Sequence, residues 1–271
     1  MGIISFIMTN EIKDLFSLEG RVAVITGGDG RLGIEHAKAL SAAGARVYSF
    51  DTVRRDVLAE FATHMDVDIT EPEKIADAVA KVVKETGRID ILVNNAVIDP
   101  PLPKEGERGW EAYPEFSKGQ WEKEIAVGLS GAQYSLQAVA PVMIKQKKGS
   151  VIQISSTSGI TAPNHSKYPP GRFKSAAYPT VKTGLLGLTR AWASYFAAVG
   201  APDVRVNALC LGAVNFKEIT PELLEKLKGR NMFGRPARPS EYHGALVFLA
   251  SDASAFMTAQ TLIVDGGQTA W

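Results

Sequence analysis

The chain has 271 residues, of which 45% are apolar and 22% are charged. This is the composition of a globular protein with a large core, and a single α/β domain reaches this length. The 30 lysines and arginines nearly balance the 29 acids, so no excess charge favours binding to nucleic acid or to an anionic membrane surface. The one cysteine, Cys210, excludes an internal disulfide and a cysteine cluster for a metal, and it fits a reducing compartment.

The N-terminal residues do not resemble a targeting segment. Residues 1–8 are apolar but brief, lack a basic stretch and lead into the polar run 9–14, unlike a secretory signal. No stretch approaches the ~20 apolar residues needed to cross a bilayer. We therefore expect a soluble cytoplasmic protein with a flexible segment at residues 1–17 and a single domain at residues 18–271.

Strand-like apolar runs alternate with longer helical patterns along the chain. In order, the patterns predict a strand at 21–26, a helix to 43, a strand at 46–50, a helix through 61, a helix at 71–85, a strand at 89–93, a loop at 99–114, a helix at 117–147, a strand at 150–155, an irregular stretch at 161–172, a helix at 175–199, a strand at 204–209, helices at 221–228 and 240–250, and a strand at 261–264. This is the rhythm of βαβ units. With a further strand before Asp68, it predicts an α/β, doubly wound Rossmann fold with a seven-stranded parallel sheet covered on both faces.

A glycine-rich turn joins the first strand to the helix that follows it, with the sequence Thr26-Gly27-Gly28-Asp29-Gly30-Arg31-Leu32-Gly33. Glycines permit a tight turn and let backbone N–H groups and the helix N-terminus reach a pyrophosphate. By itself the pattern is also compatible with an ordinary glycine-rich turn.

Asp51 closes the second strand, where a carboxylate accepts hydrogen bonds from the adenosine ribose hydroxyls. It would repel a 2′-phosphate and so favours NAD over NADP, although Arg31, Arg54 and Arg55 lie near it in sequence. A helix N-cap is an alternative role for Asp51, and both roles can coexist.

Tyr178 and Lys182 are four residues apart at the start of a predicted helix, so both side chains project from one face. Pro179, between them, is tolerated because it falls in the first helical turn. A tyrosine of pKa ~10 must become acidic to act near pH 7, a shift worth ~4 kcal/mol. The neighbouring ammonium, helped by the positive charge of an oxidised nicotinamide, is the expected cause. Ser156 follows the fifth strand, at the edge where open α/β sheets bind ligands.

Taken together and in order, these features resemble the short-chain dehydrogenase/reductase family over about residues 18–271. Further segments carry the resemblance: Asp68-Ile69, Asn94-Asn95-Ala96, Ser155-Ser156, Tyr178-Pro179-Thr180-Val181-Lys182, Arg205-Val206-Asn207-Ala208, Phe248-Leu249-Ala250-Ser251-Asp252 and Val264-Asp265-Gly266-Gly267.

The resemblance implies an NAD(H)-dependent oxidoreductase that interconverts a secondary alcohol and a carbonyl. Tyr178 would be the general acid/base, Lys182 would hold the nicotinamide ribose and lower the tyrosine pKa, and Ser156 would polarise the substrate carbonyl. The cofactor-binding residues would be Gly27, Gly30, Leu32, Gly33, Asp51, Asp68, Ile69, Asn95, Ala96, Tyr178, Lys182, Gly212 and Val214. A small-molecule substrate and a homo-oligomer, a tetramer or else a dimer, are expected. Nucleic acid and membrane are not expected, given the balanced charge and the lack of a long apolar stretch. A metal is not expected, because the four histidines lack metal-ligand spacing.

Several positions depart from the family pattern. Gly128 stands where the family has an active-site asparagine, and Val97, Leu211 and Phe216 replace a usual glycine, proline and threonine. The glycine spacing, with Gly30 one position early, resembles the family's extended, nucleotide-sugar-modifying branch. Two alternatives therefore stay open: a catalytically weak or inactive dinucleotide-binding protein, and a cofactor-retaining sugar epimerase or dehydratase.

An insertion at about residues 163–173 lengthens the segment between Ser156 and Tyr178. It is basic, through His165, Lys167, Arg172 and Lys174, so we expect an anionic substrate such as an acidic or nucleotide-linked sugar. A similar insertion, glycine turn and C-terminal ending give a narrower resemblance to flagellin and surface-glycan modification members. A solvated loop with no specific role for its charges is the alternative.

Overall fold

A parallel sheet forms the centre of the protein. The structure, a computed structural model, describes residues 11–99, 110–216, 221, 225, 229 and 231–270. Seven strands pair in parallel in the order β3-β2-β1-β4-β5-β6-β7. Their bounds are β1 (Val22–Thr26), β2 (Arg46–Asp51), β3 (Thr63–Asp66), β4 (Ile91–Asn94), β5 (Gly149–Ser156), β6 (Val204–Leu211) and β7 (Thr261–Val264). The predicted doubly wound Rossmann fold is confirmed.

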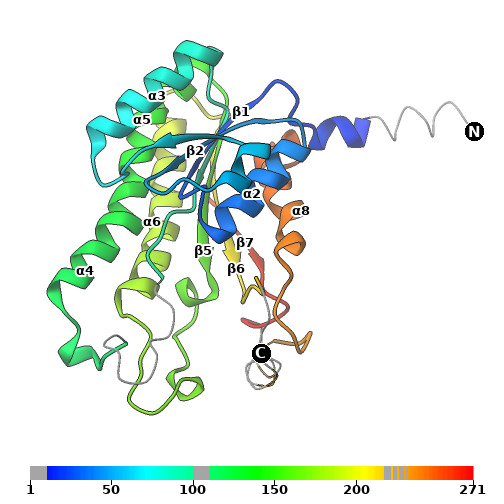
Figure 1. Ribbon diagram of the computed structural model, residues 1–271. Helices are drawn as coiled ribbons and strands as arrows, with labels where there is room; N and C mark the ends of the chain where they lie inside the picture. Colours follow the sequence, from blue (N-terminus) through cyan, green and yellow to red (C-terminus); the bar gives the residue numbers. More distant parts are fainter. Residues whose placement is uncertain are drawn as a thin grey trace, which may run out of the picture.

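Helices cover both faces of this sheet (Figure 1). The helices are α2 (Arg31–Ala42), α3 (Pro72–Thr86), α4 (Lys118–Ile125), α5 (Gly131–Gln146), α6 (Ala177–Ala198) and α8 (His243–Ala250). α2 and α8 pack on one face, and α3, α5 and α6 pack on the other, each with its own apolar core. β1 and β6 are buried at every position, as strands covered on both sides must be.

Some elements differ from the sequence prediction. The helix expected at 117–147 is divided by a π-helical turn, Ala126–Ser130, between α4 and α5. The helix expected through residue 61 is only a 3-10 turn, Asp56–Glu60, because the chain pairs again in β3 three residues later. Residues 11–16, within the segment expected to be flexible, form a short helix. Most of the helix expected at 221–228 lies outside the described residues.

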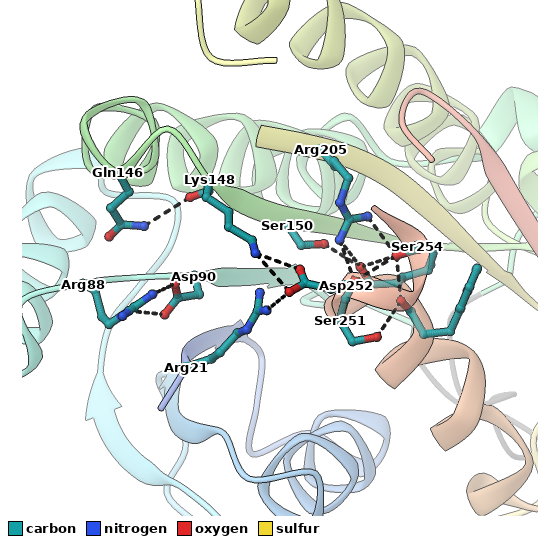
Figure 2. Close-up of polar contacts among 12 residues, drawn as sticks. Arg21, Arg88, Asp90, Gln146, Lys148, Ser150, Arg205, Ser251, Asp252 and Ser254 are labelled. Atoms are coloured by element: carbon teal, nitrogen blue, oxygen red, sulfur yellow. Dashed lines mark hydrogen bonds and ion pairs between the residues drawn. The ribbon is translucent and has the colours of Figure 1, made fainter. Parts of the chain in front are cut away.

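The amino ends of the strands are closed by a polar cluster, shown in Figure 2. The buried Arg205 guanidinium donates to the carbonyl oxygens of Leu249 and Ser251, both at 3.0 Å, and to Ser254 Oγ at 2.9 Å. Asp252 accepts from Arg21 at 2.6 Å and from Lys148. The segments around Arg205 and Asp252, which carry part of the family resemblance, thus stabilise the amino ends of the strands. Ser156 lies at the opposite, carboxyl end of β5.

Candidate active site

A cleft of about 1510 Å³ runs along the carboxyl ends of the strands. Its lining comes from the glycine turn, from the ends of β2, β4, β5 and β6, and from the start of α6. The structure brings twelve of the thirteen residues expected to bind the cofactor, and Ser156, to this one surface; Gly33 alone does not line it. The edge predicted from the strand order is therefore the hollowed one.

The glycine turn is shaped by close backbone contacts. Gly27 has a φ of +63°, and a Cβ atom there would lie 2.9 Å from Ala96 Cα. A Cβ atom at Gly33 would collide with the Gly27 carbonyl, so Gly33 lets α2 pack on the turn and does not itself line the cleft. Gly30 is the N-cap of α2 and, as a glycine, has no side chain that could cover the helix N-terminus. The turn fits a pyrophosphate, because the first N–H groups of a helix have no partner within the helix, and Gly30, Arg31 and Leu32 at the start of α2 line the cleft.

Asn95 supports the turn from behind. Its side-chain nitrogen donates to the carbonyl oxygens of Thr26 at 3.1 Å and Gly27 at 2.9 Å. These bonds join the end of β4 to the end of β1, so the carbonyl groups of the turn are fixed. Asn95 therefore supports the glycine turn and also lines the cleft.

Two carboxylates meet at the end of β2. Asp51 accepts hydrogen bonds from the backbone N–H groups of Asp29 at 3.1 Å and Val53 at 3.0 Å. The Asp29 side chain is fully buried and accepts from Ser49 Oγ at 2.6 Å and His64 Nδ1 at 2.9 Å. Asp29 was not anticipated as a site residue; its only sequence signal is an acid inside a glycine turn. The cleft at this end is lined by Asp51 and also by Arg31, whereas Asp29 lies beneath the surface.

The next wall of the groove is formed by Asp68, Ile69 and Ala96. Hydrogen bonds from the Thr70 N–H at 2.9 Å and the Thr70 hydroxyl at 2.7 Å lower the pKa of Asp68. Ile69 lies against Gly131 of α5: a Cβ atom at position 131 would be 2.6 Å from Cδ1 of Ile69. These contacts fix both residues at the rim of the sheet.

Ser156, Tyr178 and Lys182 converge at the other end of the cleft. Ser156 ends β5 and forms a side-chain hydrogen bond with the Tyr178 hydroxyl. Lys182 is buried; its Nζ donates to the Ile154 carbonyl at 2.7 Å and lies 5.7 Å from the centre of the Tyr178 ring. One turn of α6 thus brings the phenol and the ammonium to the same side, as the spacing predicts.

The protonation of this group differs from the expectation. Burial raises the pKa of Tyr178, and Asp99 adds to the shift, whereas the Ser156 hydrogen bond opposes it. Burial also lowers the pKa of Lys182 to about 8. Burial therefore opposes an acidic phenol in the ligand-free site, because removing both side chains from water disfavours both charged forms.

Gly128 sits in the π-helical turn against α6. A Cβ atom there would lie 2.6 Å from Cγ1 of Val181, the residue directly before Lys182. Val181 is fully buried and fills the space in which a longer side chain at position 128 would project. Val97, Leu211 and Phe216 all line the cleft.

Some basic side chains of the inserted loop make contacts within the chain. Lys174 is ion-paired with Asp99, which follows β4. His165 lies among aromatic rings, with centres 5.5 Å from both Tyr113 and Phe173. The side chain of Lys167 lies outside the part of the structure that is described. At least two of the four basic groups are engaged within the chain.

Among the described residues, no group of three or more His, Cys, Asp or Glu side chains could hold a metal ion. His36 is buried, and burial lowers its pKa to about 3. Cys210 is buried in β6, as expected for a core residue. None of the helices in the described ranges has both the length and the apolar character needed to cross a membrane.

Comparisons with known proteins agree on one family. The family model described as "Enoyl-(Acyl carrier protein) reductase" matches residues 30–269. A 3-oxoacyl-[acyl-carrier-protein] reductase, FabG, of Thermotoga maritima is 34% identical over 92% of this chain and 98% of its own length. A galactitol 2-dehydrogenase (L-tagatose-forming) of Cereibacter sphaeroides is 31% identical over 96% and 100%. The crystal structure of a gluconate 5-dehydrogenase from Burkholderia cenocepacia J2315, in complex with NADP and tartrate, superposes with a TM-score of 0.80 at 30% identity, covering 96% of this chain and 99% of that one.

Proposed function

The chain belongs to the short-chain dehydrogenase/reductase family and is an oxidoreductase of CH–OH groups; from this premise we propose that it interconverts a secondary alcohol and a carbonyl with NAD(H), using Tyr178 as the general acid/base. The observation that carries the proposal is the convergence of Ser156, Tyr178 and Lys182 on one end of the cleft whose other end is the glycine turn. A bound nicotinamide supplies the hydride acceptor or donor, and the protein supplies orientation and proton transfer.

In the oxidation direction, Tyr178, as the phenolate, would take the O–H proton of the substrate alcohol while the carbon that bears this hydroxyl gives its hydride to the acceptor that the nicotinamide would supply. Ser156 donates a hydrogen bond to the substrate oxygen and holds it beside the phenol. Lys182 keeps one donor on the Ile154 carbonyl, and its other N–H groups are free to hold ribose hydroxyls and to stabilise the phenolate. Reduction reverses each step.

The cofactor we propose is NAD. The support is the pair of carboxylates at the end of β2: Asp51 faces the cleft, and Asp29 is held directly behind it. A 2′-phosphate placed there would meet negative charge at short range, whereas ribose hydroxyls would donate to Asp51.

The substrate we propose is of the sugar or polyol type, acidic sugars included. Relatives that act on galactitol and gluconate support it. So does the mixture of acidic, basic and hydroxyl groups near Ser156, where Asp99, Lys123, Thr161 and Lys174 line the cleft.

A homo-oligomer, a tetramer or else a dimer, belongs to the same proposal. Exposed apolar side chains on two separate surfaces support it: Trp121 and Tyr195 on α4 and α6, and Phe256 and Ile263 near the edge strand β7. Light scattering coupled to size-exclusion chromatography measures the assembly. A cytoplasmic location stays a prediction.

The activity is tested by screening sugars, polyols and sugar acids for a change in NADH absorbance. We expect Tyr178→Phe to abolish turnover and to leave NADH binding, measured by fluorescence titration, within a factor of about two. Normal turnover by this variant would refute the mechanism.

Two other results would replace the proposal with an alternative. Binding of NADH by the wild type without turnover of any compound would indicate a non-catalytic dinucleotide-binding protein. Tightly co-purifying NAD that undergoes no net reduction would indicate an epimerase or dehydratase.

A further inference from the structure

A second lysine lies on the proposed catalytic tyrosine. Lys174 Nζ is 4.3 Å from the centre of the Tyr178 ring, closer than the 5.7 Å of Lys182 Nζ. Its side chain is only 12% exposed. An ammonium on the face of an aromatic ring is attracted to its electrons, and more strongly when it is withdrawn from water. The Lys174 ammonium is therefore fixed in position, unlike that of a solvated surface lysine.

Two further groups hold the ammonium of Lys174. The Asp99 carboxylate, which follows β4, forms an ion pair with it. The Trp110 ring, at the other end of the segment that follows β4, lies 4.9 Å from it, and the Phe173 N–H donates to the Trp110 carbonyl at 2.8 Å. Lys174 thus joins the inserted loop to the segment after β4, and it does so on the Tyr178 ring.

We propose that Lys174 is a positioning residue of the reaction, which fixes the Tyr178 ring and, opposed by Asp99, shares with Lys182 the electrostatic control of the phenol's proton. The inference rests on the proposed role of Tyr178. Lys174 belongs to the insertion. Neither the glycine turn nor the spacing between Tyr178 and Lys182 predicts a role for it.

The groups that face Tyr178 come from five parts of the chain. They are Lys182 of α6, Lys174 and Tyr168 of the inserted loop, Asp99 after β4, Ser156 of β5 and Cys210 of β6. Asp99, Tyr168 and Cys210 raise the pKa of Tyr178, and the Ser156 hydrogen bond lowers it. Burial holds the pKa of the Cys210 thiol near 12, so that group stays neutral and does not change charge in the working range. Lys174 and Asp99 are therefore an opposed pair of charges at the phenol.

Removing either member of the pair breaks the same contact but changes the phenol in opposite directions. Lys174→Met removes a positive charge, so the phenolate becomes harder to form and the pKa rises. Asp99→Asn removes a negative charge and leaves the ammonium, so the pKa falls. A charge this near shifts a pKa by roughly 1 unit or more. A merely structural ion pair would give both variants the same defect.

The experiment is the pH profile of kcat/KM for alcohol oxidation by the full-length enzyme, using a substrate found in the screen. Because the base form of Tyr178 is needed, kcat/KM rises with pH, and the midpoint of this rising limb is set by the pKa of Tyr178. We expect Lys174→Met to move the limb to higher pH by about one unit and Asp99→Asn to move it to lower pH by a similar amount. In the double variant the two shifts should largely cancel, and Lys174→Arg should restore the wild-type limb. Lys118→Met, which removes an exposed lysine of α4, should leave the profile unchanged.

Limbs that coincide for the wild type and both single variants, or that move in the same direction, overturn the inference. A rise in KM restricted to acidic substrates, with no shift of the limb, also overturns it and assigns Lys174 to binding a substrate carboxylate. If Tyr178→Phe turned over normally, the proposed function itself would fail, so the two failures are distinguishable. Circular dichroism and thermal melting of each variant show whether it folds. If Lys174→Met does not fold, Lys174→Arg tests the inference in its place.

Discussion

The contact between Gly128 and Val181 predicts that the effect of Gly128→Ala on the free energy of unfolding changes sign with the residue at position 181. The substitution is made in the wild type and in the Val181→Ala variant. In the wild type, the new Cβ atom would lie 2.6 Å from Val181 Cγ1 and 3.2 Å from its Cγ2. Overpacking of this kind costs about 1 to 3 kcal/mol. Replacing glycine by alanine within a helix returns roughly 0.5 to 1 kcal/mol. We therefore expect Gly128→Ala to destabilise the wild type by about 1 kcal/mol, within a range of about 0 to 2.5.

In the Val181→Ala background both clashing methyl groups are gone, so only the helical gain is left. The same substitution should then stabilise the protein by roughly 0.5 to 1 kcal/mol. The coupling between the two sites should be about 1 to 3 kcal/mol, which is normal for residues in direct contact.

Urea unfolding of the four proteins, followed by circular dichroism, measures this cycle. Because Val181 directly precedes Lys182, kcat should fall in the wild-type background and recover in part in the double variant. An equal effect of Gly128→Ala in both backgrounds would refute the packing argument. Gly119→Ala in α4, where a Cβ atom would meet nothing within 4 Å, serves as the matched control.

The remaining predictions concern the cofactor and the pH dependence of stability. Asp51→Asn should raise the ratio of kcat/KM for NADPH to that for NADH by at least ~10-fold, equivalent to about 1.4 kcal/mol, because it removes the repulsion of a 2′-phosphate; Asp66→Asn, exposed on the neighbouring strand, should leave the ratio unchanged. For Asp252, burial opposes ionisation, yet hydrogen bonds from Lys148 and Arg21 win and lower its pKa. Its contribution to stability is therefore present above the unfolded pKa of ~3.9 and is lost as the pH falls through the folded value. Asp252→Asn should melt below the wild type at pH 7, and a gap in Tm that did not narrow below about pH 4 would contradict this account.

The sequence by itself determined the fold and the main lines of the cleft. Buried strands separated by helices predict a parallel sheet, and a parallel sheet brings all its carboxyl ends to one edge. The sequence therefore predicts, without any knowledge of side-chain contacts, which residues meet at this edge: Gly27, Asp51, Ser156 and Tyr178. These inferences succeed because hydrophobic periodicity is a local property of the chain, and parallel pairing then places the carboxyl ends of all strands at one side of the sheet.

Tertiary structure alone decided the electrostatics of the site. Burial, a property of the packed state, raises the pKa of Tyr178 where spacing to Lys182 predicted the opposite. Packing also decided that Val181 occupies the space beside Gly128. Asp99 and Lys174 are 75 positions apart, and they meet only because β4 and β5 are neighbours in the sheet. Charges act through distance in space, and that distance is fixed by the order and packing of the strands rather than by the order of residues along the chain.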